Sequence, residues 1–140
     1  MSSRAQRILA VDFGDRRTGL AATDYTGTIA LPLGTLEGLA PPICAQEIGN
    51  LARERECQVI VLGLPLTADG KVGERARITL RFKNLLEAAA PCPVVTTDEA
   101  LSTEEAHERL HHMSAARRKR VADTVAAVVI LERYRQETGA

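Results

Sequence analysis

Short aliphatic runs alternate along the chain with longer amphipathic stretches. Apolar runs at residues 8–11 and 19–23 and near 29–33 are separated by short polar turns. This spacing predicts three strands in an antiparallel meander. The unbroken apolar runs at residues 59–62 and 94–96 predict two further strands, because strands buried on both faces of a parallel sheet lose the polar alternation.

The segments between and after these runs have helical periodicity. Residues 41–56 and 74–90 carry apolar side chains at three- and four-residue spacing, which predicts two amphipathic helices. The sequence from Ser102 to Glu105 has the spacing of a capping box, which begins a helix. Residues 121–136 predict a final buried helix, although their valine content also suits a strand. We therefore expect one α/β domain over residues 1–140, with a mixed five-stranded sheet, three antiparallel strands and then parallel strands, flanked by helices.

Composition and charge narrow the classes of function. The chain has 18 basic and 18 acidic residues, which argues against a nonspecific nucleic-acid coat protein but allows a local basic face. Only 3% of residues are aromatic, so base stacking is an unfavoured mode of binding. The three cysteines form no CxxC pair, which predicts neither a disulfide framework nor a zinc site. No secretion signal or membrane-spanning run is recognisable, so we expect a cytoplasmic protein without membrane contact.

Acidic residues follow the predicted strands. Asp12 ends the first strand, Asp98-Glu99 ends the last one, and Asp123 lies in the first turns of the final helix. Carboxylates on neighbouring elements repel one another unless a divalent cation or a proton lies between them. All-oxygen ligands favour Mg²⁺ or Mn²⁺. Gly14 would let another chain, a metal ion or a phosphate approach the backbone closely. The alternatives are a strand and turn that happen to contain Asp12, and an exposed helix end that favours Asp123.

Taken together, these segments resemble the YqgF/RuvX family within the ribonuclease H-like superfamily. Members are described as pre-16S rRNA nucleases and as Holliday-junction-resolvase-like proteins. The resemblance covers residues 7–136, and the matching segments stand in family order. They are Val11-Asp12-Phe13-Gly14 with Thr18-Gly19, residues 61–66 with Asp69-Gly70, Asp98-Glu99 with residues 101–106, and residues 119–123 with Ala126-Ala127 and Ile130-Leu131.

The resemblance implies a ribonuclease H-like nuclease domain in which Asp12, Glu99 and Asp123 bind Mg²⁺ or Mn²⁺ and catalyse phosphodiester hydrolysis. Gly14 and Asp98 would support them. One position departs from the family pattern, since the usual arginine after Asp-Glu is Ala100 here. That departure puts substrate affinity or rate in doubt, and Arg16 or Arg17 could supply the missing guanidinium.

Two basic groups lie near the predicted acidic site. Arg117, Arg118, Lys119 and Arg120 precede Asp123, and the pair Arg16-Arg17 follows the Asp12 strand. Beside metal-binding acids, such cations are suited to contact phosphates. The alternative for residues 117–120 is a solvated linker.

These observations lead to one main hypothesis and three alternatives. The main hypothesis is a metal-dependent endonuclease that processes the 5′ end of precursor 16S rRNA during ribosome biogenesis. The same chemistry could act on branched DNA, where a symmetric four-way junction would suit a homodimer. A third possibility is a non-catalytic nucleic-acid-binding factor in transcription or ribosome assembly. A fourth is the actin-like ATPase fold, which opens with a similar strand and turn but requires a second lobe.

Overall fold

The computed structural model describes residues 6–99 and 115–139. Within these residues, aliphatic runs form the strands and amphipathic stretches form the helices. In chain order, the elements are β1 (Ile8–Asp12), β2 (Arg17–Thr23), β3 (Ala30–Glu37), α1 (Pro41–Glu54), β4 (Val59–Leu64), α2 (Glu74–Ala89), β5 (Val94–Asp98) and α4 (Ala115–Thr138).

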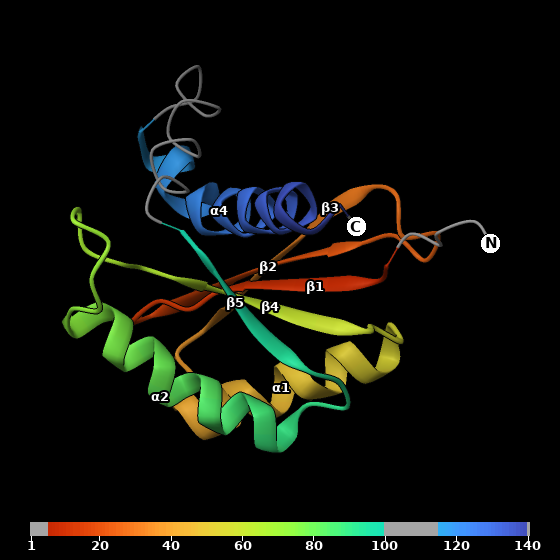
Figure 1. The fold of residues 1–140 in the computed structure, drawn as a ribbon, viewed down its shortest axis with the longest axis horizontal. Helices are drawn as coiled ribbons and strands as arrows, with labels where there is room; N and C mark the ends of the chain where they lie inside the picture. The colour runs from red at the N-terminus through yellow and green to blue at the C-terminus, as the bar shows by residue number, and fades with distance from the viewer. Residues whose placement is uncertain (1–5, 100–114, 140) are drawn as a thin grey trace.

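The strands form a mixed five-stranded sheet in the order β3-β2-β1-β4-β5 (Figure 1). β2 is antiparallel to both β1 and β3, whereas β4 is parallel to both β1 and β5. The predicted mixed sheet is therefore confirmed. Because β1, β4 and β5 run in the same direction, their carboxyl ends lie at the same edge of the sheet.

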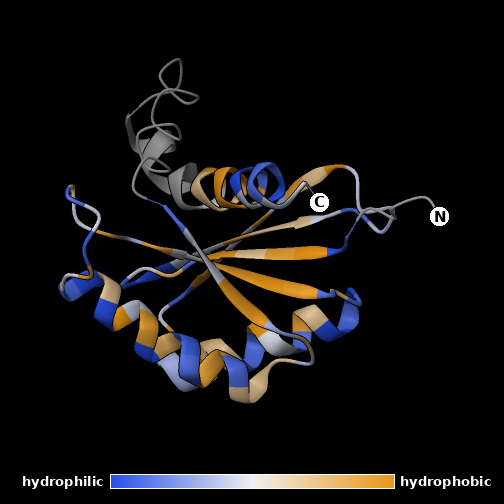
Figure 2. Cartoon of the chain, in the orientation of Figure 1, coloured by the Kyte–Doolittle hydropathy of each residue, from blue (hydrophilic) through white to orange (hydrophobic). Residues whose placement is uncertain are grey.

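Helices cover both faces of the sheet, with α4 on one face and α1 and α2 on the other (Figure 1). In β1, Ile8 and Ala10 pack with residues of α4, while Leu9 and Val11 pack with residues of α1 and α2. Figure 2 shows the hydrophobic strands enclosed between these two layers. Since side chains alternate along a strand, Asp12 falls on the α4 face of the sheet. No helix in the described ranges is long and apolar enough to cross a membrane.

Two predicted boundaries are wrong. The last helix begins at Ala115 rather than at residue 121, so the basic run 117–120 belongs to its first turns and is not a linker. Arginine and lysine are good helix formers, and they extend the helix instead of interrupting it. The strand β4 continues to Leu64, which places Gly63 in the sheet rather than in the following loop. The helix predicted from Ser102 lies outside the described residues.

Two of the few aromatic rings pack against each other inside the protein. The rings of Phe13, just after β1, and Phe82, in α2, are stacked with centroids 3.9 Å apart and planes 7° apart. Phe82 is almost completely buried. This pair therefore joins α2 to the end of β1 and contributes to the core.

Helices α1 and α2 are in close contact at Gly49. A Cβ atom at Gly49 would lie only 2.5 Å from the carbonyl oxygen of Ala89. Replacing a helical glycine by alanine normally stabilises a protein by up to about 1 kcal/mol. Here we expect Gly49→Ala to lower the free energy of unfolding by about 1–3 kcal/mol, because backbone atoms cannot rotate away from the new methyl group.

Urea denaturation would measure this change. The matched control is Glu47→Ala, at an exposed position of the same helix, which we expect to change stability by no more than about 0.5 kcal/mol. A Gly49→Ala protein as stable as the wild type would contradict the close packing of the two helices.

Candidate active site

Asp12 and Glu99 meet at the sheet edge where the parallel strands end. Asp12 is the last residue of β1, and Glu99 directly follows β5. The backbone N–H of Glu99 donates a hydrogen bond to the carbonyl of Leu64, at the end of β4, over 3.2 Å. The two carboxyl groups are hydrogen-bonded to each other. Three adjacent parallel strands therefore bring together two acids that are far apart in the sequence.

Helix α4 holds the end of β5 in place. Arg133 donates a hydrogen bond from Nη1 to the carbonyl oxygen of Asp98 over 2.6 Å. One strand position earlier on the same face as Glu99, the Thr97 hydroxyl donates to the carboxylate of Glu137. The Asp98 side chain is exposed, whereas that of Glu99 is buried. The strand alternation thus turns Glu99 toward the α4 face and Asp98 toward solvent.

The Glu99 carboxyl group favours its protonated form. Burial is the largest cause, since only 8% of Glu99 is exposed, and desolvation disfavours a charged carboxylate. The negative charge of Asp12, its hydrogen bond with Glu99 and the negative charge of Asp98 act in the same direction. Together they raise the pKa of Glu99 to about 9, while the positive charge of Arg75 lowers it. Near neutral pH, Glu99 therefore favours its protonated form in the absence of a metal ion.

A divalent cation would satisfy this pair in place of the proton. Two hard oxygen donors in contact, one of them buried, are the donor set that Mg²⁺ and Mn²⁺ prefer. A bound cation offsets the mutual repulsion of the carboxylates and removes the reason for protonation. The residues present therefore fit a divalent metal ion.

Gly63 makes room for the Glu99 side chain. A Cβ atom at Gly63 would lie 2.9 Å from both Cδ and Oε2 of Glu99, and 2.5 Å from Cδ1 of Ile130 in α4. Any side chain at this position would therefore compete with the carboxyl group or with the core under α4. The sequence alone did not reveal this role, since the apolar run predicts a strand only over residues 59–62. A glycine beside a run of β-branched residues is the signal for such a close approach.

The remaining predicted site residues on α4 are placed only by their backbone. Asp123 lies on α4, one helical turn before Ala127, which packs in the core between α4 and the sheet. The side chains of Asp123, Arg117, Arg118, Lys119 and Arg120 lie outside the described part of the structure, as does Ala100. In the described part, no group of three or more His, Cys, Asp or Glu side chains is arranged to hold a metal ion.

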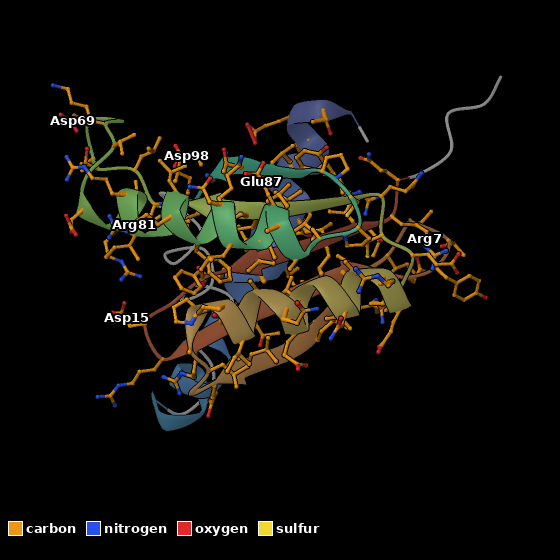
Figure 3. All side chains as sticks on the ribbon, turned by 90° about the horizontal axis from the view of Figure 1, so that it is seen from below. Arg7, Asp15, Asp69, Arg81, Glu87 and Asp98 are labelled. Carbon is orange, nitrogen blue, oxygen red and sulfur yellow. The ribbon has the colours of Figure 1, made fainter. Side chains whose placement is uncertain are left out.

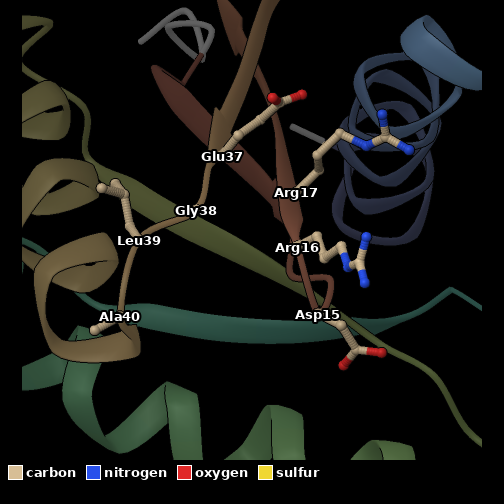
Figure 4. Close-up of a pocket in the computed structure, with 7 residues that line it drawn as sticks. All are labelled: Asp15, Arg16, Arg17, Glu37, Gly38, Leu39 and Ala40. Atoms are coloured by element: carbon tan, nitrogen blue, oxygen red, sulfur yellow. The ribbon is translucent and has the colours of Figure 1, made fainter.

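Arg16 and Arg17 line an open groove between the turn after β1 and the segment that joins β3 to α1. The groove has a volume of about 620 Å³. Figure 4 shows the side chains of the two arginines extending in the same direction. Two carboxylates also contribute to the wall, so the groove is not uniformly basic. Its lining residues are Asp15, Arg16, Arg17, Glu37, Gly38, Leu39 and Ala40.

Gly14 serves the turn between β1 and β2. A Cβ atom there would lie 2.4 Å from the carbonyl oxygen of Arg17, so the close approach in the structure is to the chain's own backbone. An approach by another chain, a metal ion or a phosphate stays a prediction. The absence of a side chain at Gly14 allows a tight turn. This turn places Arg16 and Arg17 near the end of β1.

Comparisons with known proteins agree on one family and one fold. The family model described as RuvX, Holliday junction resolvase, matches residues 6–137. A protein from Chloroflexus aurantiacus named "Putative pre-16S rRNA nuclease" is 39% identical, over 92% of this chain and 86% of that protein. A protein of the same name from Synechococcus sp. (strain JA-3-3Ab) is 38% identical, over 92% of this chain and 82% of its own length.

Solved structures share the fold at low sequence identity. Thermus thermophilus RuvC in complex with a Holliday junction substrate has a TM-score of 0.59 and 12% identity, covering 94% of this chain and 96% of that one. Fowlpox virus resolvase with Holliday junction DNA has a TM-score of 0.55 and 10% identity, covering 94% and 98%. The predicted ribonuclease H-like fold is confirmed.

The raised pKa of Glu99 makes stability depend on pH. Because the pKa of Glu99 is raised from 4.5 to about 9, its stabilising contribution is complete below about pH 4.5 and is lost as pH rises through about 9. Glu99→Gln keeps a neutral hydrogen-bonding group and avoids this loss. We expect its stability advantage over the wild type to grow by about 2 kcal/mol between about pH 5.5 and about pH 7.5.

Thermal unfolding in the presence of a chelator, repeated over that pH range, would test the expectation. Glu54→Gln, on an exposed position of α1, removes the same charge in solvent and should show no growing advantage. An advantage of Glu99→Gln that stays constant with pH would contradict a protonated Glu99.

The close contact at Gly63 leads to a second expectation. Gly63→Ala should lower the free energy of unfolding by about 1–3 kcal/mol, because the new methyl group overpacks the site. It should also displace the Glu99 carboxyl group, so the pH dependence of stability should become shallower. The titration described above, applied to Gly63→Ala, measures both effects. A variant with unchanged stability and an unchanged pH profile would show that the site has more space than the structure indicates.

Proposed function

The chain belongs to the RuvX family of nucleases and Holliday junction resolvases, and we propose that it is a single-domain, metal-dependent endonuclease. Its substrate would be a structured nucleic acid, whose phosphodiester bonds it hydrolyses. The observation that carries the proposal is the hydrogen-bonded pair of Asp12 and Glu99 at the carboxyl ends of parallel strands. Such a pair holds a proton only in the absence of a better counter-charge.

Three acids of the chain would hold Mg²⁺ or Mn²⁺. Asp12 and Glu99 fit this role by their contact, and Asp123 is proposed from its position on α4 and the family resemblance. When bound, the metal supplies an activated water at neutral pH and stabilises charge on the leaving oxygen. The backbone of Glu99 is held by its hydrogen bond to Leu64, and its carboxyl group packs against Gly63. The side chain is therefore already positioned to bind a metal ion. Asp98 and Gly14 support the ends of the two strands.

The proposed substrate is the 5′ end of precursor 16S rRNA, processed in the cytoplasm. The names of the curated relatives support it. Arg16 and Arg17, in the groove beside the turn that follows β1, would contact phosphates together with the basic run Arg117, Arg118, Lys119 and Arg120 in the first turns of α4. Each such contact adds about 0.7–0.9 to the slope of log affinity against log salt.

Branched DNA is the second candidate substrate. The family description and the fold likeness to resolvases bound to Holliday junctions favour it. A symmetric four-way junction requires two cuts in strands of like polarity, and two copies of the chain would satisfy that symmetry.

Parallel cleavage assays would test the proposal. Precursor 16S rRNA and a four-way DNA junction would be incubated with the wild type in Mg²⁺ or Mn²⁺, with and without a chelator. We expect the wild type to cleave one of the two substrates. Substitution of a residue that only contacts a metal ligand lowers activity about 10- to 100-fold, and Asp12→Asn, which changes a metal ligand itself, should lower the cleavage rate by more than that. Glu47→Gln, on the exposed face of α1, should cleave as the wild type does.

The outcomes separate the alternatives. Cleavage that survives both the chelator and Asp12→Asn would exclude metal-dependent catalysis by this pair. Binding of nucleic acid without any cleavage would favour a non-catalytic binding factor. The preferred substrate distinguishes rRNA processing from junction resolution.

A further inference from the structure

Arg75 approaches the acidic pair from a separate element. It lies in the first turn of α2, and its Nη1 donates a hydrogen bond to Oδ1 of Asp15 over 2.6 Å. Asp15 stands in the turn after β1, three residues beyond Asp12. The positive charge of Arg75 also acts on Glu99, whose pKa it lowers. Arg75 is therefore near both strand ends that carry the acids.

The ion pair between Arg75 and Asp15 contributes little to the stability of the fold. Their side chains are 46% and 79% exposed, and an exposed ion pair contributes only about 0–1 kcal/mol to stability. The first turn of α2 is held independently, since the Arg77 N–H donates to the Gly73 carbonyl over 3.0 Å. What the bond with Asp15 does fix is the direction of the guanidinium group.

Several carboxyl groups lie at this end of the molecule, which Figure 3 shows also carries Arg81. Asp15 and Asp98 lie at the same end in Figure 3, opposite Arg7, and Asp12 and Glu99 add two further carboxyl groups. An incoming phosphodiester is negative, so a cation beside the acidic pair, in addition to Arg16 and Arg17, would offset the repulsion. A guanidinium has five N–H donors in a planar fork that matches a phosphate. Within the described residues, Arg75 uses Nη1 for its hydrogen bond with Asp15, and its other N–H donors suffice for a bidentate contact with an anion.

We propose that Arg75 is a phosphate-binding residue of the active site, held in place by Asp15 and directed at the backbone of the nucleic acid beside Asp12 and Glu99. The inference rests on the proposed function, because it takes a nucleic-acid phosphate as the ligand. The sequence did not indicate Arg75: it belongs to no basic run, and its nearness to Glu99 depends on the packing of α2 at the sheet edge.

The test compares Arg75→Ala with a matched variant. Arg77→Ala removes the same charge two residues later on the same helix, where Arg77 pairs with Glu74 of its own helix over 3.5 Å. Affinities for a labelled precursor 16S rRNA fragment and a labelled four-way DNA junction would be measured by fluorescence anisotropy over a series of salt concentrations. All variants would carry Asp12→Asn, so that no substrate is consumed during the measurement.

We expect Arg75→Ala to weaken binding about tenfold and to reduce the salt slope by about one unit. Arg77→Ala should keep the parental affinity and slope. Arg75→Lys, which keeps the charge but not the planar fork, should bind with intermediate affinity. Thermal unfolding of each variant should stay close to that of the parent, which excludes loss of fold as the cause.

Equal losses in Arg75→Ala and Arg77→Ala, or no loss in Arg75→Ala, would overturn the inference. Cleavage by otherwise wild-type chains then separates it from the proposed function. If binding depends on Arg75 but the wild type cleaves neither substrate, the nuclease proposal fails and the inference stands. If the wild type cleaves and Arg75→Ala cleaves with the same KM, the inference fails and the function stands. A wild type that neither binds nor cleaves refutes both.

Discussion

The contact between the carboxyl groups of Asp12 and Glu99 is the constraint on which the site depends. Two acids in contact, one of them buried, are costly unless a proton or a cation lies between them. The surrounding structure imposes this contact through three parallel strands that end at one edge, with Glu99 tied to Leu64 and accommodated by Gly63. The fold therefore holds two carboxyl groups close enough to repel each other, and a bound divalent cation would offset that repulsion.

The two faces of the sheet contribute differently to that contact. Helix α4 packs on the face that carries Asp12, and its Ile130 side chain lies against the same Gly63 that makes room for Glu99. Helices α1 and α2 form the opposite layer, and α2 brings Arg75 to the sheet edge from that side. A rigid sheet with helices on both faces can thus hold the two acids in place, while a basic side chain approaches them from a helix on one face.

Family and fold give this arrangement its context. The chain belongs to the RuvX family, and it shares its fold with resolvases at only 10–12% identity. Most of the core side chains can differ at that level, because a core requires volume and apolar character more than particular residues. The family arginine that is replaced by Ala100 lies outside the described residues. Arg75 would supply a guanidinium to the active site from α2 instead.

The sequence by itself determined the elements and the candidate acids. Aliphatic runs identified the five strands that the structure describes, since a short apolar run is visible within a few adjacent residues, and the motifs pointed to Asp12 and Glu99. Tertiary structure alone decided that Glu99 holds a proton, that Gly63 must lack a side chain and that Arg75 acts on Glu99. These properties arise from atoms brought together across β1, β4, β5 and α2. Local patterns report the periodicity of one element, whereas charge and space at a site depend on contacts between elements.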